Sequence, residues 1–243
     1  MITYIVLLLL AGGLPYYIFL ENNKYLNSKQ IFLLSGFLLL CAIFLSLSLP
    51  NDHPDLLVIV SFLSAIFSIY KATKTTSFYK LGYYLIFVNA PFFILFEDRG
   101  MMYSLSLLVS LAGLYLVGRF YEKNYGSANY GNITGITLIT PCIGTFLSFY
   151  LIALALYPPF PNSLYFLNYV FKSQHDLLSY VVVTTLFFGN FFLAMGVMKK
   201  TLFGRANPNI HYVHMTIKEK IIHSIVLIVL IVLSVFGLKE TLL

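Results

Sequence analysis

Eight long apolar segments follow one another along the 243-residue chain, and only short polar segments separate them. A helix needs roughly 20 apolar residues to cross about 30 Å of hydrocarbon. The pattern therefore predicts an all-α fold, a multi-pass transmembrane bundle of about eight helices in a single transmembrane domain over residues 1–243. The predicted spans are Ile2–Leu20, Ile31–Leu49, Leu56–Tyr70, Leu81–Phe96, Met101–Phe120, Ile133–Tyr157, Leu177–Met198 and Ile221–Leu238.

Composition also indicates a surface that faces lipid. Charged residues make up 10% of the chain and hydrophobic residues 59%, and the mean hydropathy is +0.86. A soluble domain has about 25% charged residues. We interpret the net charge of +6 as topology-setting charge near lipid headgroups rather than as a surface for nucleic acid. Basic residues occur on both sides of several spans, so this pattern leaves the orientation open.

The chain offers no recognisable catalytic or metal-binding motif. Cys41 and Cys142 lie inside apolar segments without metal-ligand spacing, and a buried cysteine usually acts as a small hydrophobic residue. The spacing of His211 and His214 could suit a metal, but no third ligand is near them. We expect no metal, no cofactor and no catalytic residue. Four histidines are expected in loops or at loop edges: His175, His211, His214 and His223.

Three prolines interrupt the apolar sequence after Tyr157. Pro158, Pro159 and Pro161 cannot continue a helix, because each removes a backbone donor and clashes with the preceding turn. One interpretation is a broken helix at membrane depth, which must be buried in protein or line a polar cavity and which marks ion pathways in transporters. The other interpretation is a loop at the membrane surface.

Several short motifs share an order and spacing with one protein family. They are Lys71–Tyr84, then Gly135 and Pro141 followed by Leu154–Phe160, then Phe191–Gly204, and finally Thr216–Lys220 with Gly237. This series resembles the C-terminal half of the proton-translocating, antiporter-like subunits of respiratory complex I, in particular subunit M, or chain 4 in mitochondria. Pro159 and Asn162 match a Pro-Pro-x-x-Asn motif of that subunit. The resemblance covers about 170 residues and leaves the first 51 residues unaligned.

The resemblance implies a membrane subunit of a respiratory NADH:quinone oxidoreductase, a complex of the respiratory electron-transport chain. The chain would take part in proton translocation or support it structurally, with other membrane-arm subunits and lipids as partners and without nucleic acid. The broken helix would contain Pro158, Pro159, Pro161 and Asn162. Abundant Lys, Asn, Ile, Phe and Tyr beside scarce Arg indicate an AT-rich genome, which favours the mitochondrial inner membrane over a bacterial cytoplasmic membrane.

The resemblance also indicates which charges would carry protons. The family's broken helix has a Lys or Glu where this chain has Phe166, so the relay is expected to be incomplete. Lys80 and Lys172 are the remaining relay candidates, although Lys80 also fits an interfacial lysine and Lys172 a helix end. Two alternative functions remain: a stand-alone ion-coupled secondary transporter, and a structural membrane-arm subunit without transport activity. We find no inverted repeat, which counts against the transporter.

Overall fold

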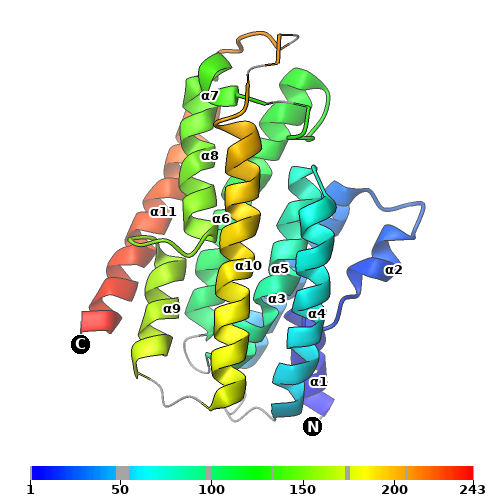
Figure 1. Ribbon diagram of the computed structural model, residues 1–243, viewed down its shortest axis with the longest axis vertical. Helices are drawn as coiled ribbons and strands as arrows, with labels where there is room; N and C mark the ends of the chain where they lie inside the picture. Colours follow the sequence, from blue (N-terminus) through cyan, green and yellow to red (C-terminus); the bar gives the residue numbers. More distant parts are fainter. Residues whose placement is uncertain are drawn as a thin grey trace.

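The computed structural model describes residues 2–47, 55–96, 100–132, 134–172, 176–205, 207–208 and 210–242. In these ranges the chain forms an up-and-down bundle of helices (Figure 1), which confirms the predicted all-α, multi-pass fold. Pro50–Pro54 and Glu97–Arg99, which separate predicted spans, lie outside the described residues, as do His175 and the side chain of Lys172. The helices are α1 (Ile2–Leu10), α2 (Tyr17–Glu21), α3 (Ser28–Ser46), α4 (Asp55–Lys74), α5 (Phe78–Leu95), α6 (Gly100–Tyr125), α7 (Ile136–Ile139), α8 (Pro141–Leu154), α9 (Pro161–Lys172), α10 (Leu177–Thr201) and α11 (Ile217–Leu242).

Six of the described helices, α3, α4, α5, α6, α10 and α11, are long and apolar enough to cross a membrane. They correspond to six of the eight predicted spans. The helices extend beyond several predicted ends; for example, the polar residues Lys71 and Lys74 continue α4.

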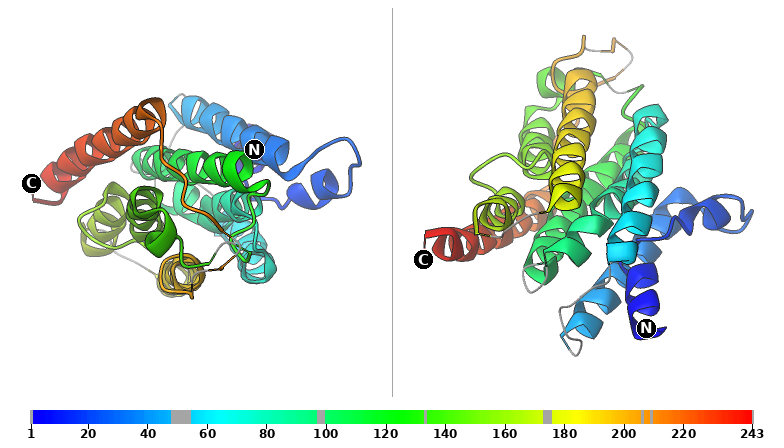
Figure 2. Two further views of the ribbon diagram at one scale, coloured as in Figure 1. Left: turned by 90° about the horizontal axis from the view of Figure 1, so that it is seen from above. Right: turned by 60° about the horizontal axis from the view of Figure 1, so that its bottom comes forward.

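The first predicted span, Ile2–Leu20, is wrong as a single helix. α1 has nine residues and is therefore about 14 Å long, which is too short to cross the hydrocarbon. Gly12 adopts a left-handed conformation with φ +84°, which favours glycine, and Pro15 follows before α2 begins. As a result α2 does not continue α1 but lies on the outer flank of the bundle (Figure 2).

The sixth predicted span, Ile133–Tyr157, also does not form a single helix. The short α7 ends before Thr140, and Pro141 begins α8. α8 has 14 residues, so it extends about 21 Å into the bundle. α9 then lies end to end with α8, and the segment that joins them is at mid-height (Figure 1). The predicted proline-broken helix is therefore present, and its break lies about midway between the two ends of the bundle (Figure 1).

α5 occupies the centre of the bundle, with 89% of its membrane-spanning window buried. It packs against α3, α4, α6 and α10. α11 lies on the periphery, where it contacts α6 and α9 (Figure 2).

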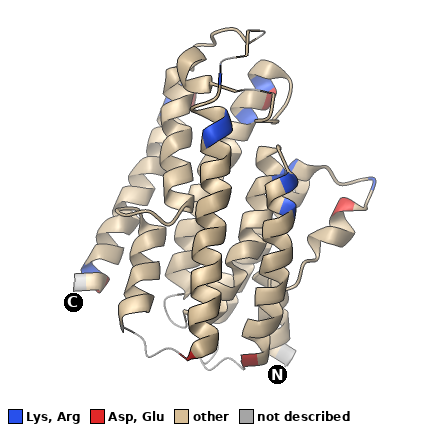
Figure 3. Cartoon of the chain, in the orientation of Figure 1, with Lys and Arg blue, Asp and Glu red and all other residues tan. Residues whose placement is uncertain are grey.

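One end of the bundle collects most of the charge, and we call it the charged end. There α3, α5 and α11 begin and α4, α6 and α10 end, and two ion pairs join them: Lys29–Glu122 and Lys123–Glu219, each with N–O distances of 2.8 Å. Figure 3 shows the basic residues gathered at this end. Because neighbouring helices run antiparallel, basic residues from the starts of some helices and from the ends of others lie at one surface. The described basic residues at these helix ends and in the segments next to them are Lys24, Lys29, Lys71, Lys74, Lys80, Arg119, Lys123, Lys199, Lys200, Arg205, Lys218 and Lys220.

Candidate functional site

The break between α8 and α9 lies on the flank of the bundle. α8 ends at Leu154, and Leu156 adopts a positive φ of 58° that turns the chain outward. Tyr157 is 61% exposed, and Pro158 and Pro159 are exposed beside it. Pro161 then starts α9, a position where its missing N–H costs nothing. The bundle therefore presents irregular backbone on its surface about halfway between its two ends.

α9 has one face of buried polar side chains. Asn162, Tyr165 and Asn168 are three residues apart, so they lie along one side of the helix, and each is 0% exposed. Within the described part of the chain, both side-chain amides and the Tyr165 hydroxyl lack a hydrogen-bond partner. A buried polar group without a partner costs about 1–3 kcal/mol. α9 packs against α6 and α11, so this unusual polar face lies in the interior, next to the break.

The position where the family resemblance expects a charge is filled by a packed aromatic ring. Phe166 is 6% exposed. Its ring centroid lies 5.6 Å from that of Phe92 on α5 and 5.4 Å from that of Phe187 on α10. These contacts surround the ring with apolar groups, so α9 joins α5 and α10 through aromatic packing at this position.

A pair of asparagines links three helices in the centre of the bundle. Asn89 of α5 donates a hydrogen bond from Nδ2 to Oδ1 of Asn190 on α10, and Asn190 donates one back, both at 2.9 Å. The hydroxyl of Tyr103 on α6 donates to Asn89 Oδ1 at 2.6 Å. Each Nδ2 also donates to a backbone carbonyl one turn earlier. The pair is neutral and hydrogen-bonded at every amide atom, so it fixes helix positions without supplying a titratable group.

Sequence reasoning missed Glu21, which α2 brings against the central helix. The hydroxyl of Tyr83 donates to Glu21 Oε1 at 2.6 Å, and the hydroxyl of Tyr84 donates to the same oxygen. Both tyrosines are almost fully buried in α5. Two adjacent tyrosines within an apolar segment were the available signal, since a buried tyrosine hydroxyl usually has a partner.

The structure does not bring the two predicted relay lysines together. Lys80 is the third residue of α5, at the charged end, and is half-exposed. Lys172 is the last residue of α9, which ends near the opposite side of the bundle (Figure 1). Relay roles for Lys80 and Lys172 stay predictions.

His223 corrects the prediction that it lies at a loop edge. α11 begins at Ile217, earlier than predicted, because the polar residues before the apolar segment form its first turn. His223 is therefore inside the helix and 3% exposed, with Nδ1 3.0 Å from the hydroxyl of Tyr150. Apart from His223 and tyrosines, the buried side chains of the described residues include no ionisable Asp, Glu, Lys or Arg. No group of three or more potential metal ligands occurs in the described part.

No family model and no curated protein sequence matches the chain. Its structure is similar to a chain of respiratory complex I from Thermus thermophilus with bound aureothin, with a TM-score of 0.61 and 15% sequence identity. The match covers 85% of this chain and 49% of that chain, so the protein spans about half the length of the chain it matches. At this identity the likeness shows a shared fold.

Proposed function

We propose that the chain is a membrane subunit of a respiratory NADH:quinone oxidoreductase of the complex I type. Two findings support this proposal. The first is the similarity of 85% of the chain to part of a complex I structure. The second is the proline-broken helix formed by α8 and α9, at the place where the motif resemblance expected it.

The observation that carries the proposal is the exposed break itself. Tyr157, Pro158 and Pro159 lie on the flank of the bundle, about halfway along its length. Irregular backbone at membrane depth is tolerated where protein covers it or where it lines a cavity, because lipid cannot hydrogen-bond to it. A neighbouring membrane subunit would provide this cover. A stand-alone transporter would instead be expected to enclose such a break.

We further propose that the chain supports proton translocation structurally rather than conducting protons through a chain of charges. A relay needs ionisable groups at depth. In the described core, Phe166 fills the expected position and the central Asn89–Asn190 pair is neutral. The proton path would then lie in neighbouring subunits that this bundle holds in place.

The charge distribution supports an orientation for this subunit. Short segments rich in Lys and Arg stay on the cytoplasmic side of a membrane. The charged end would therefore face the cytoplasm, or the matrix if the chain lies in the mitochondrial inner membrane. The mitochondrial location stays a prediction from composition, with the bacterial cytoplasmic membrane as the alternative.

The experiment combines purification with site-specific cross-linking. A photo-reactive amino acid replaces Tyr157 at the break, and a matched one replaces Ile228, which is 58% exposed on α11. After mild solubilisation, we expect the chain to migrate with a large NADH-oxidising assembly and Tyr157 to form a protein adduct in a much higher yield than Ile228. A homogeneous small oligomer without NADH oxidation would refute the proposal. Equal adduct yields at the two positions would refute the argument from the break.

A further inference from the structure

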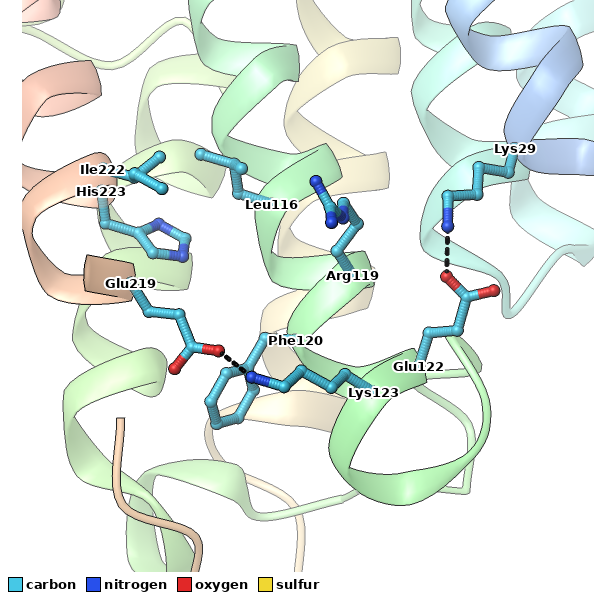
Figure 4. A pocket seen from close by; sticks show the side chains of 9 residues that line it. All are labelled: Lys29, Leu116, Arg119, Phe120, Glu122, Lys123, Glu219, Ile222 and His223. Atoms are coloured by element: carbon cyan, nitrogen blue, oxygen red, sulfur yellow. Dashed lines mark hydrogen bonds and ion pairs between the residues drawn. The ribbon is translucent and has the colours of Figure 1, made fainter. Parts of the chain in front are cut away.

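A cavity of about 380 Å³ opens at the charged end between α6, α11 and the start of α3 (Figure 4). Its wall combines the basic side chains of Lys29, Arg119 and Lys123 with the apolar side chains of Leu116 and Ile222. Charged and apolar groups thus share one opening at the level where the headgroups of a bilayer would lie.

The charges around this cavity leave one cation in excess. Glu122 is paired with Lys29, and Glu219 is paired with Lys123, each at 2.8 Å. No carboxylate among the described residues forms an ion pair with Arg119. Glu122 Oε2 already accepts hydrogen bonds from Lys29 and Tyr79. Figure 4 shows the Arg119 guanidinium pointing away from both ion pairs, where an anionic group could approach it.

A second, apolar cavity of about 400 Å³ lies between α3 and α6. No residue lines both cavities, but their linings follow one another along α3 and α6 at spacings of three or four residues, so the two cavities lie along the same pair of helix faces. Arg119 is one turn beyond Tyr115, and Lys29 is one turn before Leu33. The α3 face carries Lys29, Leu33, Gly36 and Leu40, and the α6 face carries Leu105, Leu108, Ala112, Tyr115 and Arg119.

The combined length of the two cavities, which we call together the groove, suits one membrane lipid. Leu105 and Arg119 are 14 positions apart on the α6 face, or about 21 Å along the helix. One leaflet contributes roughly half of the 30 Å hydrocarbon thickness. The groove is open beside Gly36, where an added Cβ would meet only Leu108 Cδ2, at 3.9 Å.

We propose that this groove binds one anionic phospholipid, with its phosphate at Arg119 and an acyl chain beside Gly36. Basic pockets between transmembrane helices on the cytoplasmic or matrix side bind such headgroups, and a guanidinium can hold a phosphate through two hydrogen bonds. Along its length the groove changes from cationic side chains at the charged end to apolar side chains farther into the bundle. A phospholipid has the matching order, with a charged headgroup followed by apolar acyl chains. The site does not depend on the proposed function.

The charge of the headgroup is tested with the full chain purified in detergent. Thermal stability is measured while phosphatidylglycerol or phosphatidylcholine is added in mixed micelles. We expect phosphatidylglycerol to stabilise the protein at lower lipid fractions. Arg119→Gln should weaken that effect about fivefold, since one basic residue near an anionic lipid contributes on the order of this factor. Arg205→Gln removes an equal charge from an exposed loop position and should leave the effect unchanged.

The acyl-chain half of the groove is tested with Gly36→Leu, whose side chain would fill the space beside Leu108. Gly196→Leu on α10 is the matched control, because an added Cβ there meets nothing within 4 Å and so has at least as much space as one at Gly36. We expect Gly36→Leu to lose the co-purified phospholipid that mass spectrometry detects in the parent protein, and Gly196→Leu to retain it. Circular dichroism checks that both variants keep their helix content.

Three results would overturn this site. Stabilisation that is equal for the two lipids would show that the headgroup charge is not recognised. Equal behaviour of Arg119→Gln and Arg205→Gln would show that Arg119 is not the phosphate ligand. A photo-reactive residue at Phe37, 61% exposed at the groove, that captures protein instead of lipid in native membranes would show that a neighbouring chain occupies the groove.

Discussion

α5 and α11 differ in both hydropathy and burial, and the less apolar helix of the two is the buried one. Of the six long helices, α5 is among the less apolar, yet 89% of its membrane-spanning window is buried, whereas α11 is the most apolar and only 17% of its window is buried. In a soluble protein the more apolar helix would be inside. In lipid the periphery can be fully apolar, while the interior is held by close packing and hydrogen bonds between helices. α5 accordingly carries Asn89 and the Tyr83–Tyr84 pair, and α11 carries a run of isoleucine and valine.

The largest expected effect contrasts a core ring on α5 with a peripheral side chain on α11. Phe87 is 0% exposed and packs its ring against Tyr16 and Tyr17, with centroids 4.7 and 4.6 Å away. Phe87→Ala should lower the free energy of unfolding by about 3–5 kcal/mol, because it leaves a cavity. Ile228→Ala should change it by less than about 0.5 kcal/mol, since lipid replaces the lost methyl groups. Denaturation in mixed micelles, followed by circular dichroism, measures both, and similar losses would contradict the contrast.

The next effect concerns the polar link from α5 to α10. Asn89→Leu and Asn190→Leu each leave one buried amide without its partner. Each variant should lose about 1–3 kcal/mol, and the double variant should lose less than the sum. Hydrogen bonds between membrane helices give coupling energies of about 0.6–1.7 kcal/mol in such double-mutant cycles. Strictly additive losses would mean that the asparagines do not stabilise the bundle through each other.

The smallest effect concerns the attachment of α11 to α6. Lys123 is mostly exposed and pairs with Glu219 in the first turn of α11. Lys123→Ala should lower stability by about 0.2–1 kcal/mol, and the loss should diminish at high salt because exposed charges are screened. Lys218→Ala, which removes an exposed lysine without an ion pair in the described part, is the control. A larger loss that persists in high salt would show that α11 depends on this pair more than on its contacts with α9.

Local sequence features predicted most of the fold. Six of the eight apolar segments form single long helices, because hydrocarbon imposes both length and composition on a spanning helix. The two other segments are each interrupted by a residue that the prediction did not treat as a helix boundary. Gly12, with φ +84°, ends the helix in the first segment, and Pro141 starts a new helix within the sixth. The break after Tyr157 was predicted, because three closely spaced prolines forbid a helix in any surroundings.

The side-chain partners of the candidate site could not be predicted from sequence. The contact of Glu21 with Tyr83 and Tyr84 depends on how α2 folds back toward α5. The asparagine pair joins residues 101 positions apart. His223 was expected at a loop edge, and only the packing of α11 against α8 residues such as Tyr150 shows that it is buried. These contacts come from helix packing, which local periodicity does not encode.

By itself, the sequence determined that this chain is a helical membrane protein with a helix broken at Pro158, since lipid solvation and proline geometry act on local segments. The tertiary structure decided which helices lie inside, and it placed most of the described lysines at one end. It also exposed the break on the flank and packed Phe166 between α5 and α10. These features depend on how helices distant in sequence pack together, because antiparallel packing, and not the order of residues along the chain, determines which side chains meet.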